Sequence, residues 1–220
     1  MKIKKLISAL VLGSMLVGLS GCNITDFSAE NLLRPPKAVG DEAEIEQLIA
    51  KTADSGYTLK YPKNGKFRSA IIMTDLDGND SNEAVAFFRN SAETSSVHML
   101  VMYSKDNSWE IASDNIFETT DIDSVDFADL TGNGKAEIIV NSTTYTPNVG
   151  KLSCYSYSEG KTNEVGSGQS CSSFVTGDFD NDGTSEIMSL VLYTTENEAL
   201  ASMLDYNEDS KSLYAKAMAN

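Results

Sequence analysis

The stretch Thr176–Tyr193, TGDFDNDGTSEIMSLVLY, places an acidic loop directly before an apolar run. Asp178, Asp180 and Asp182 stand at alternate positions, a glycine follows at once, and Glu186 precedes the apolar residues. Carboxylates two residues apart repel one another, so a cation or full solvation must offset their charge. The pattern therefore predicts an oxygen-rich loop that leads into a β-strand.

Two more stretches have the same layout, MTDLDGNDSNEAVAFF at Met73–Phe88 and FADLTGNGKAEIIVNS at Phe127–Ser142. The first aspartates of the loops are 54 and 49 residues apart, and this nearly fixed period indicates a repeat architecture. Positions 1, 3, 5, 7 and 9 of the loops are the candidate ligands. They are Asp75, Asp77, Asn79, Ser81 and Glu83 in the first loop, Asp129, Thr131, Asn133, Lys135 and Glu137 in the second, and Asp178, Asp180, Asp182, Thr184 and Glu186 in the third.

Each loop separates the first and second of four short runs rich in Val, Ile, Tyr and Phe. The runs are 69–74, 83–88, 97–104 and 108–113, then 124–128, 137–142, 152–158 and 162–167, and finally 172–177, 186–193, 200–206 and 212–218. Four-stranded units that repeat at about 50 residues are typical of β-propeller blades. We therefore expect an all-β fold of three blade repeats, at about 66–115, 122–168 and 171–220. Propellers use at least four blades, so three units predict an incomplete or open propeller, with edge strands through which copies could self-associate.

A hard cation such as Ca²⁺ takes six to eight oxygen ligands at about 2.3–2.6 Å. Side chains at positions 1, 3, 5 and 9 offer oxygens, and position 7 offers its backbone carbonyl. Position 6 needs a positive φ, which suits Gly134, Gly183 and, in the first loop, Asp80. Affinity rises with the number of charged ligands, so we expect up to three Ca²⁺ sites, with loop 178–186 strongest and loop 129–137 weakest. The same residues can also form plain Asx turns that bind nothing, and the sequence leaves this alternative open.

The acidic start of the loop matches an EF-hand, but position 12 is Ala86, Val140 or Ser189 instead of glutamate. With its acid at position 9, the loop resembles the calcium loops of FG-GAP and VCBS-type repeats, which occur in integrin α-chain propellers. This resemblance runs from about residue 66 to the end and implies calcium binding through positions 1, 3, 5 and 9. The chain lacks the family's Phe-Gly and Gly-Ala-Pro signatures and uses Glu, not Asp, at position 9.

The N-terminus, MKIKKLISALVLGSMLVGLSGC at 1–22, joins three lysines to an apolar stretch and small residues, as in a secretory signal peptide. Its end resembles the bacterial lipobox, which implies lipidation of Cys22 and anchoring to the outer face of the bacterial cytoplasmic membrane. An ordinary cleaved signal is the alternative. Residues 23–40 are expected to be a flexible tether. The whole layout is similar to lipoproteins of Gram-positive anaerobes that carry such repeats.

Residues 41–65 are expected to contain a short helix, at about 42–53, and a lead-in to the strands. Asp41 and Glu44 have the spacing of a capping box, and Ile45, Leu48 and Ile49 form one apolar stripe.

Two cysteines, Cys154 and Cys171, follow the predicted signal peptide. Export would permit a disulfide between them, and two small buried hydrophobic residues are the alternative.

The net charge of −15 argues against nucleic acid as a partner, because phosphates require a basic surface. Catalytic motifs are lacking: His98 is the sole histidine, and EGKT at 159–162 lacks the earlier glycine of a phosphate loop. We therefore expect a non-enzymatic binding module for an extracellular protein or glycan. The alternatives are an enzyme or accessory protein of polysaccharide processing and a calcium-stiffened spacer.

Overall fold

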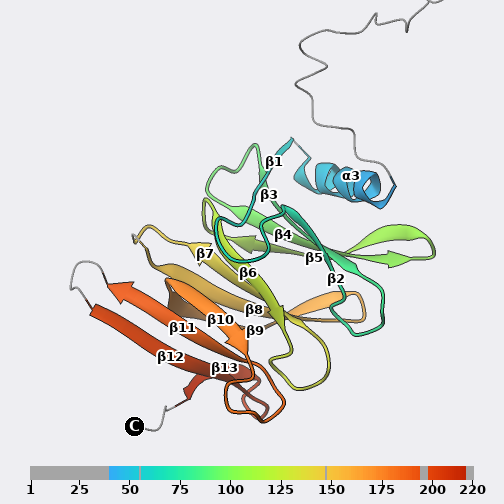
Figure 1. The fold of residues 1–220 in the computed structure, drawn as a ribbon. Helices are drawn as coiled ribbons and strands as arrows, with labels where there is room; N and C mark the ends of the chain where they lie inside the picture. Colours follow the sequence, from blue (N-terminus) through green and yellow to red (C-terminus); the bar gives the residue numbers. More distant parts are fainter. Residues whose placement is uncertain (1–39, 55, 147, 194–197, 217–220) are drawn as a thin grey trace, which may run out of the picture. The chain divides into compact units, whose positions relative to one another are not determined.

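The computed structural model describes residues 40–54, 56–146, 148–193 and 198–216, which form one helix and three antiparallel β-sheets (Figure 1). Each sheet is open, with an edge strand on either side, and none closes on itself. This confirms the prediction of an all-β fold with one short helix. The predicted signal peptide, the lipobox cysteine Cys22 and the tether up to residue 39 lie outside the described residues.

The first sheet has five strands, and the other two have four each. The first contains β1 (Tyr57–Leu59), β2 (Ile71–Thr74), β3 (Glu83–Asn90), β4 (Val97–Lys105) and β5 (Ser108–Phe117). The second contains β6 (Ile122–Ala128), β7 (Glu137–Thr143), β8 (Gly150–Ser158) and β9 (Lys161–Cys171). The third contains β10 (Ser173–Gly177), β11 (Glu186–Tyr193), β12 (Glu198–Asn207) and β13 (Ser212–Lys216). Each predicted run overlaps one of these strands, whereas β1 was not predicted; it pairs with β3 beyond the end of β2.

The helix α3 (Asp41–Ala53) forms where it was predicted, but the predicted capping box is wrong. Its N-cap is Gly40, with no side-chain cap, and Asp41 already lies inside the helix. Glu44 instead accepts a hydrogen bond of 3.0 Å from the backbone N–H of Trp109 in β5. Glu44 therefore does not cap the helix but connects it to the first sheet. In the described part of the chain, no helix has the length and apolar character needed to cross a membrane.

The second sheet shares one core with the first sheet and another with the third. Val85 and Val101 of the first sheet pack with Ile138 and Val140 of the second, while Ile139 packs with residues of the third. Successive side chains of β7 therefore pack alternately against the first and the third sheet, because side chains of a strand point to opposite faces. The other face of the first sheet packs against α3 through a cluster that contains Ile45, Ile49, Ala84, Phe88, Leu100 and Trp109.

The third sheet buries one face and exposes apolar side chains on the other. Ile187 and Leu204 lie in the core shared with the second sheet. Alternation places Val175, Leu192 and Tyr214 on the opposite face, where they are 58%, 38% and 41% exposed. Among the described residues, no element covers this face in the way that α3 covers the first sheet.

Cys154 and Cys171 are both buried and both free, so the alternative of two small core residues is the correct one. In the register of β8 and β9, Cys154 faces Gly166, whereas Cys171 faces Gly150. This offset of four residues along β8 is about 13 Å, beyond the roughly 7 Å between Cα atoms that a disulfide can bridge.

Candidate metal centre

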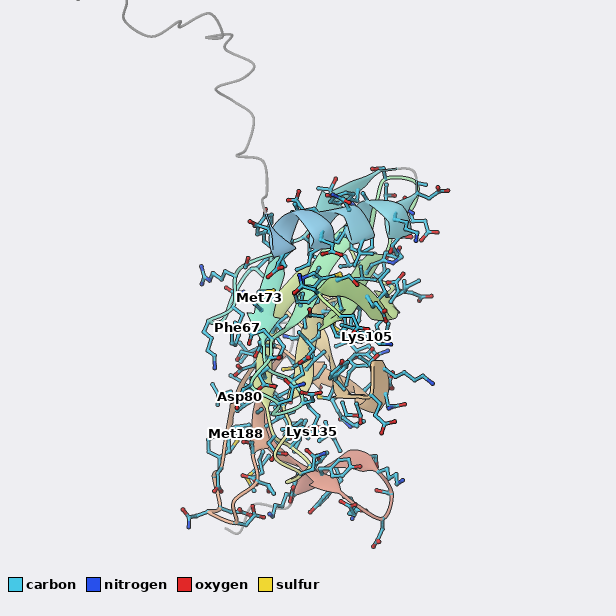
Figure 2. All side chains as sticks on the ribbon, turned by 90° about the vertical axis from the view of Figure 1, so that its right-hand side faces the viewer. Phe67, Met73, Asp80, Lys105, Lys135 and Met188 are labelled. Atoms are coloured by element: carbon cyan, nitrogen blue, oxygen red, sulfur yellow. The ribbon has the colours of Figure 1, made fainter. Side chains whose placement is uncertain are left out.

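Each acidic loop joins the first strand of its four-strand unit to the second, so the three loops lie between β2 and β3, β6 and β7, and β10 and β11. Two hydrogen bonds connect them in series. The N–H of Ala136 in the second loop donates to the carbonyl of Leu76 in the first at 3.0 Å. The N–H of Ser185 in the third loop donates to the backbone carbonyl of Asp129 in the second at 2.8 Å. Figure 2 labels Asp80 of the first loop and Lys135 of the second, the two loops that the bond between Ala136 and Leu76 connects.

The aspartate at position 1 organises each loop by accepting backbone N–H bonds. In the third loop, Asp178 accepts from Asp182 at 3.2 Å and from Gly183 at 3.1 Å. Asp129 accepts equivalent bonds in the second loop, and Asp75 accepts three in the first. Burial alone would raise the pKa of Asp75, but the N–H bonds outweigh it and lower the pKa, which keeps this carboxylate charged.

The glutamate at position 9 is buried in every loop. Glu83, Glu137 and Glu186 are 3%, 1% and 0% exposed, and each Oε2 accepts the backbone N–H of position 2 at 2.8 Å. Position 9 is the first residue of the following strand, so the strand fixes this carboxylate under the loop. The hydrogen bonding of the remaining oxygen, Oε1, differs between the second and third loops.

Two positions of each loop adopt a positive φ. The predicted one, position 6, has φ values of 65° at Asp80, 79° at Gly134 and 97° at Gly183. Position 4 is also left-handed, which was not predicted, at Gly78, Gly132 and Asn181. A glycine or asparagine at position 4 was the available signal.

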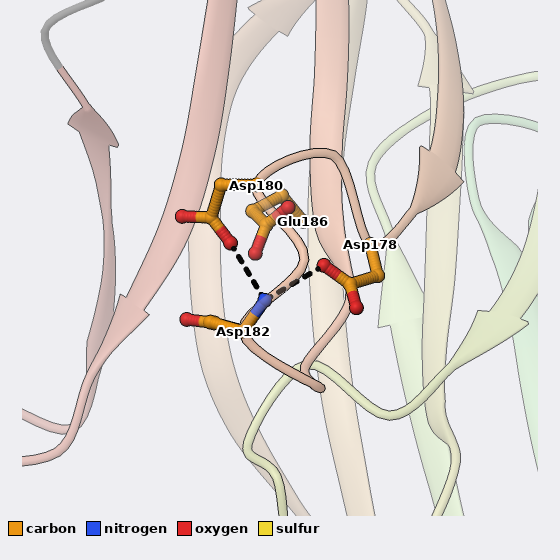
Figure 3. A group of neighbouring side chains, drawn as sticks. All are labelled: Asp178, Asp180, Asp182 and Glu186. Atoms are coloured by element: carbon orange, nitrogen blue, oxygen red, sulfur yellow. Dashed lines mark hydrogen bonds between the residues drawn. The ribbon is translucent and has the colours of Figure 1, made fainter.

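The third loop brings all four of its carboxylates together (Figure 3). One oxygen each from Asp178, Asp180, Asp182 and Glu186 lies within 4.8 Å of the others. Glu186 Oε1 is buried and has no hydrogen-bond partner. Burial raises the pKa of Glu186, and the charges of Asp180 and Asp182 raise it further. An unpaired carboxylate oxygen inside an acidic cluster costs free energy, and a cation between the four oxygens would remove that cost.

The first loop has a similar centre with three acids, Asp75, Asp77 and Glu83, whose oxygens also lie within 4.8 Å of one another. Here the buried oxygen without a partner is Asp77 Oδ1. Burial, together with the charges of Asp77 and Asp75, raises the pKa of Glu83 to about 7. This loop therefore also has the oxygen atoms and the excess negative charge that suit a hard cation.

In the second loop, a side chain of the loop itself donates a hydrogen bond to the buried glutamate. Thr131 Oγ1 donates a hydrogen bond of 3.3 Å to Glu137 Oε1, the oxygen whose counterpart in the third loop lacks a partner. Only Asp129 and Glu137 are acidic among its positions 1, 3, 5 and 9, too few to form a cluster of three acids. Of the three loops, this one therefore shows the least need of a cation, while the predicted order of affinities stays a prediction.

Positions 5 and 7 form an Asx turn in every loop. The side-chain oxygens of Asn79, Asn133 and Asp182 accept the backbone N–H of position 7 at 2.7, 2.8 and 2.9 Å. The position-7 residues are Ser81, Lys135 and Thr184. The role of their carbonyls as ligands stays a prediction. The structure shows that their N–H groups hold the turn.

A contact that was not predicted reaches the third loop from the opposite edge strand of its sheet. Lys216, the last residue of β13, forms ion pairs with Asp180 and, at 3.0 Å, with Asp205 of β12. These carboxylates raise the pKa of Lys216 above its ordinary value. No sequence signal marks this pair, because Lys216 and Asp180 are 36 residues apart.

His98 lies away from the loops, in β4. Its ring stacks on Phe88 with 4.8 Å between ring centroids, and Nδ1 lies 2.9 Å from Asp114 Oδ1. His98 is 7% exposed and is therefore a packed residue.

No model of a known protein family matches this chain, and a comparison with curated proteins finds no significant match. The similarity to FG-GAP and VCBS-type repeats therefore stays a prediction that rests on the loop residues themselves.

Proposed function

We propose that this chain is an exported, lipid-anchored bacterial protein whose propeller-type β-repeats bind Ca²⁺ and present a binding surface to an extracellular protein or glycan. The observation that carries the calcium part is the buried, unpartnered Glu186 Oε1 within a cluster of four carboxylates. The sites would be held by Asp178, Asp180, Asp182 and Glu186 and by Asp75, Asp77 and Glu83.

Calcium is favoured over other cations by the donor set. All the clustered side chains are carboxylates, and neither cluster contains the soft sulfur or imidazole groups that select zinc or copper. The excess negative charge also suits a divalent ion. Extracellular calcium modules have dissociation constants of about 10⁻⁴ to 10⁻³ M, and we expect that range here.

A polar depression favours a small polar ligand such as a saccharide. Its volume is about 530 Å³, and Asn64, Asp121, Asp123, Asn141 and Thr143 are among the residues that line it. It lies at the end of the second sheet where β7 connects to β8. The acidic loop connects β6 to β7 at the other end of β7, so the depression and the loop lie at opposite ends of the sheet. The nearby Tyr145 is 94% exposed and offers a ring on which a sugar could stack.

Thermal melting with calcium and with chelator tests the cation sites. Calcium should raise the melting temperature of the parent, and at ten times the dissociation constant one site adds about 1.4 kcal/mol to the free energy of unfolding. No calcium effect would return both clusters to the plain-turn interpretation.

Two further experiments test anchoring and recognition. Cys22→Ala should release the protein or leave it unprocessed, and lipid labelling of that variant would contradict the anchor. On a glycan array, Tyr145→Ala should weaken any binding that the parent shows. Hydrolysis of a glycan by the parent would instead favour the enzyme alternative, and failure of glycan and protein pull-downs would favour the spacer.

A further inference from the structure

Lys216, at the end of β13, places its ammonium group against the third loop, which has the most carboxylates. Lys216 Nζ contacts Asp180 Oδ2 and lies 3.0 Å from Asp205 Oδ2. Tyr214 O–H also donates to Asp205 Oδ2, at 3.1 Å, so β13 presents two side chains to the same carboxylate. The lysine is thus held between a loop carboxylate and a strand carboxylate.

This arrangement is specific to the third loop. Asp180 occupies position 3, one of its oxygens accepts the N–H of Asp182 at 3.3 Å, and the other faces the ammonium. Among the described residues, no lysine, arginine or histidine forms an ion pair with an acid of the first or second loop. The loop with the most carboxylates is therefore the one that has its own cationic side chain.

We propose that Lys216 is a built-in counter-ion of the third loop, whose ammonium competes with a divalent cation for Asp180, so that cation binding proceeds by exchange and loosens the hold of β13 on the loop. The inference rests on the proposed calcium binding at this loop. It assigns to Lys216 the role of setting the affinity of that site.

The sign of the effect follows from electrostatics. Without a divalent ion, the ammonium reduces the repulsion among four carboxylates and stabilises the loop. When a divalent ion binds, the same ammonium repels it across a few ångströms and shares one of its ligands. Removal of the charge should therefore tighten cation binding and destabilise the cation-free protein. A lysine that merely oriented Asp180 for the cation would give the opposite result, because its loss would weaken binding.

Calcium binding to the purified exported domain, measured by calorimetry, tests the proposal with three variants. Lys216→Gln should bind calcium at the third loop about three- to tenfold more tightly than the parent, as expected for one screened charge near a divalent ion. Lys216→Arg keeps the charge and should stay within about twofold of the parent. Lys211→Gln removes an equal charge from the exposed β12–β13 turn and should also stay within about twofold.

Thermal melting gives a second expected result. In chelator, Lys216→Gln should melt below the parent, and calcium should raise its melting temperature by more than it raises that of the parent. Calcium binding by the parent together with unchanged or weaker binding by Lys216→Gln would overturn the proposal. No calcium binding by the parent would overturn the proposed function itself, so the two failures are distinguishable.

A measurement on the parent removes dependence on the folding of the variants. Lys216 should react faster with an amine-acetylating reagent in calcium than in chelator, as read from its peptide by mass spectrometry, while Lys211 should react equally in both. Equal or slower labelling of Lys216 in calcium would contradict the exchange.

Discussion

Thr131 Oγ1 donates a hydrogen bond of 3.3 Å to Glu137 Oε1, and this bond distinguishes the second loop from the other two. In the third loop, position 3 is Asp180, which as a carboxylate has no proton to donate, and the equivalent Glu186 Oε1 has no partner. A hydroxyl proton thus fulfils in one loop the role that we assign to a cation in another.

The first prediction is that Thr131→Val lowers the free energy of unfolding by about 1–3 kcal/mol, because it leaves a buried carboxylate oxygen without a partner. The loss should be the same in calcium and in chelator, as measured by urea denaturation. Thr131→Ser keeps the hydroxyl and serves as the control. A loss that appears only in calcium would mean that the second loop binds the ion.

The second prediction concerns stoichiometry. Calorimetry should find two calcium ions per chain, with the tighter site in the third loop, because it has four carboxylates against three in the first. Glu186→Gln should remove the tighter site and Asp77→Asn the weaker one, whereas Thr131→Val should leave both. Binding of a third ion that Thr131→Val abolishes would refute the assignment.

The third prediction tests the contact between the second and third loops. A Cβ atom at Gly132 would lie 2.7 Å from Thr184 Cγ2, whereas one at Gly134 would meet nothing within 4 Å. Both glycines have a positive φ, so each alanine variant incurs about 1–2 kcal/mol of backbone strain.

Gly132→Ala should therefore destabilise the protein more than Gly134→Ala does, as measured by thermal melting. Adding Thr184→Ser, which deletes the contacting methyl group, should reduce the difference. Equal melting temperatures for the two alanine variants would show that the loops separate easily.

The fourth prediction concerns pH. Burial raises the pKa of Glu137 from 4.5 to about 6. Between these values the folded state keeps a proton that the unfolded state has lost, so this group's contribution to the free energy of unfolding falls as pH rises from about 4.5 to about 6. Glu137→Gln should remove that part of the slope in chelator, and Glu208→Gln, at an exposed turn, should not. Identical slopes for the parent and Glu137→Gln would contradict the prediction.

The strands and the loop positions could be predicted because their signals are local. Runs of β-branched and aromatic residues alternate with turn residues, and position 6 of each loop, such as Asp80, shows the predicted positive φ. The capping box failed because the chain turns one residue earlier, at Gly40, which leaves Glu44 available to a strand 65 residues away.

Contacts that depend on how the chain packs in three dimensions gave no local signal. The pairing of Lys216 with Asp180 depends on how β13 meets the loop, and the bond between Thr131 and Glu137 depends on the burial of position 9. Spacing predicted the carboxylates that cluster in the first and third loops, but it did not predict which oxygens stay without a partner.

The helix α3 makes the two ends of the row of sheets unlike each other. At the α3 end, addition of another sheet would first require removal of the helix, which would uncover Ile45 and Ile49. At the other end, Val175, Leu192 and Tyr214 already form an apolar face that the described residues leave uncovered. The two ends are therefore chemically unequal: a further layer would displace a packed helix at one and cover exposed apolar side chains at the other.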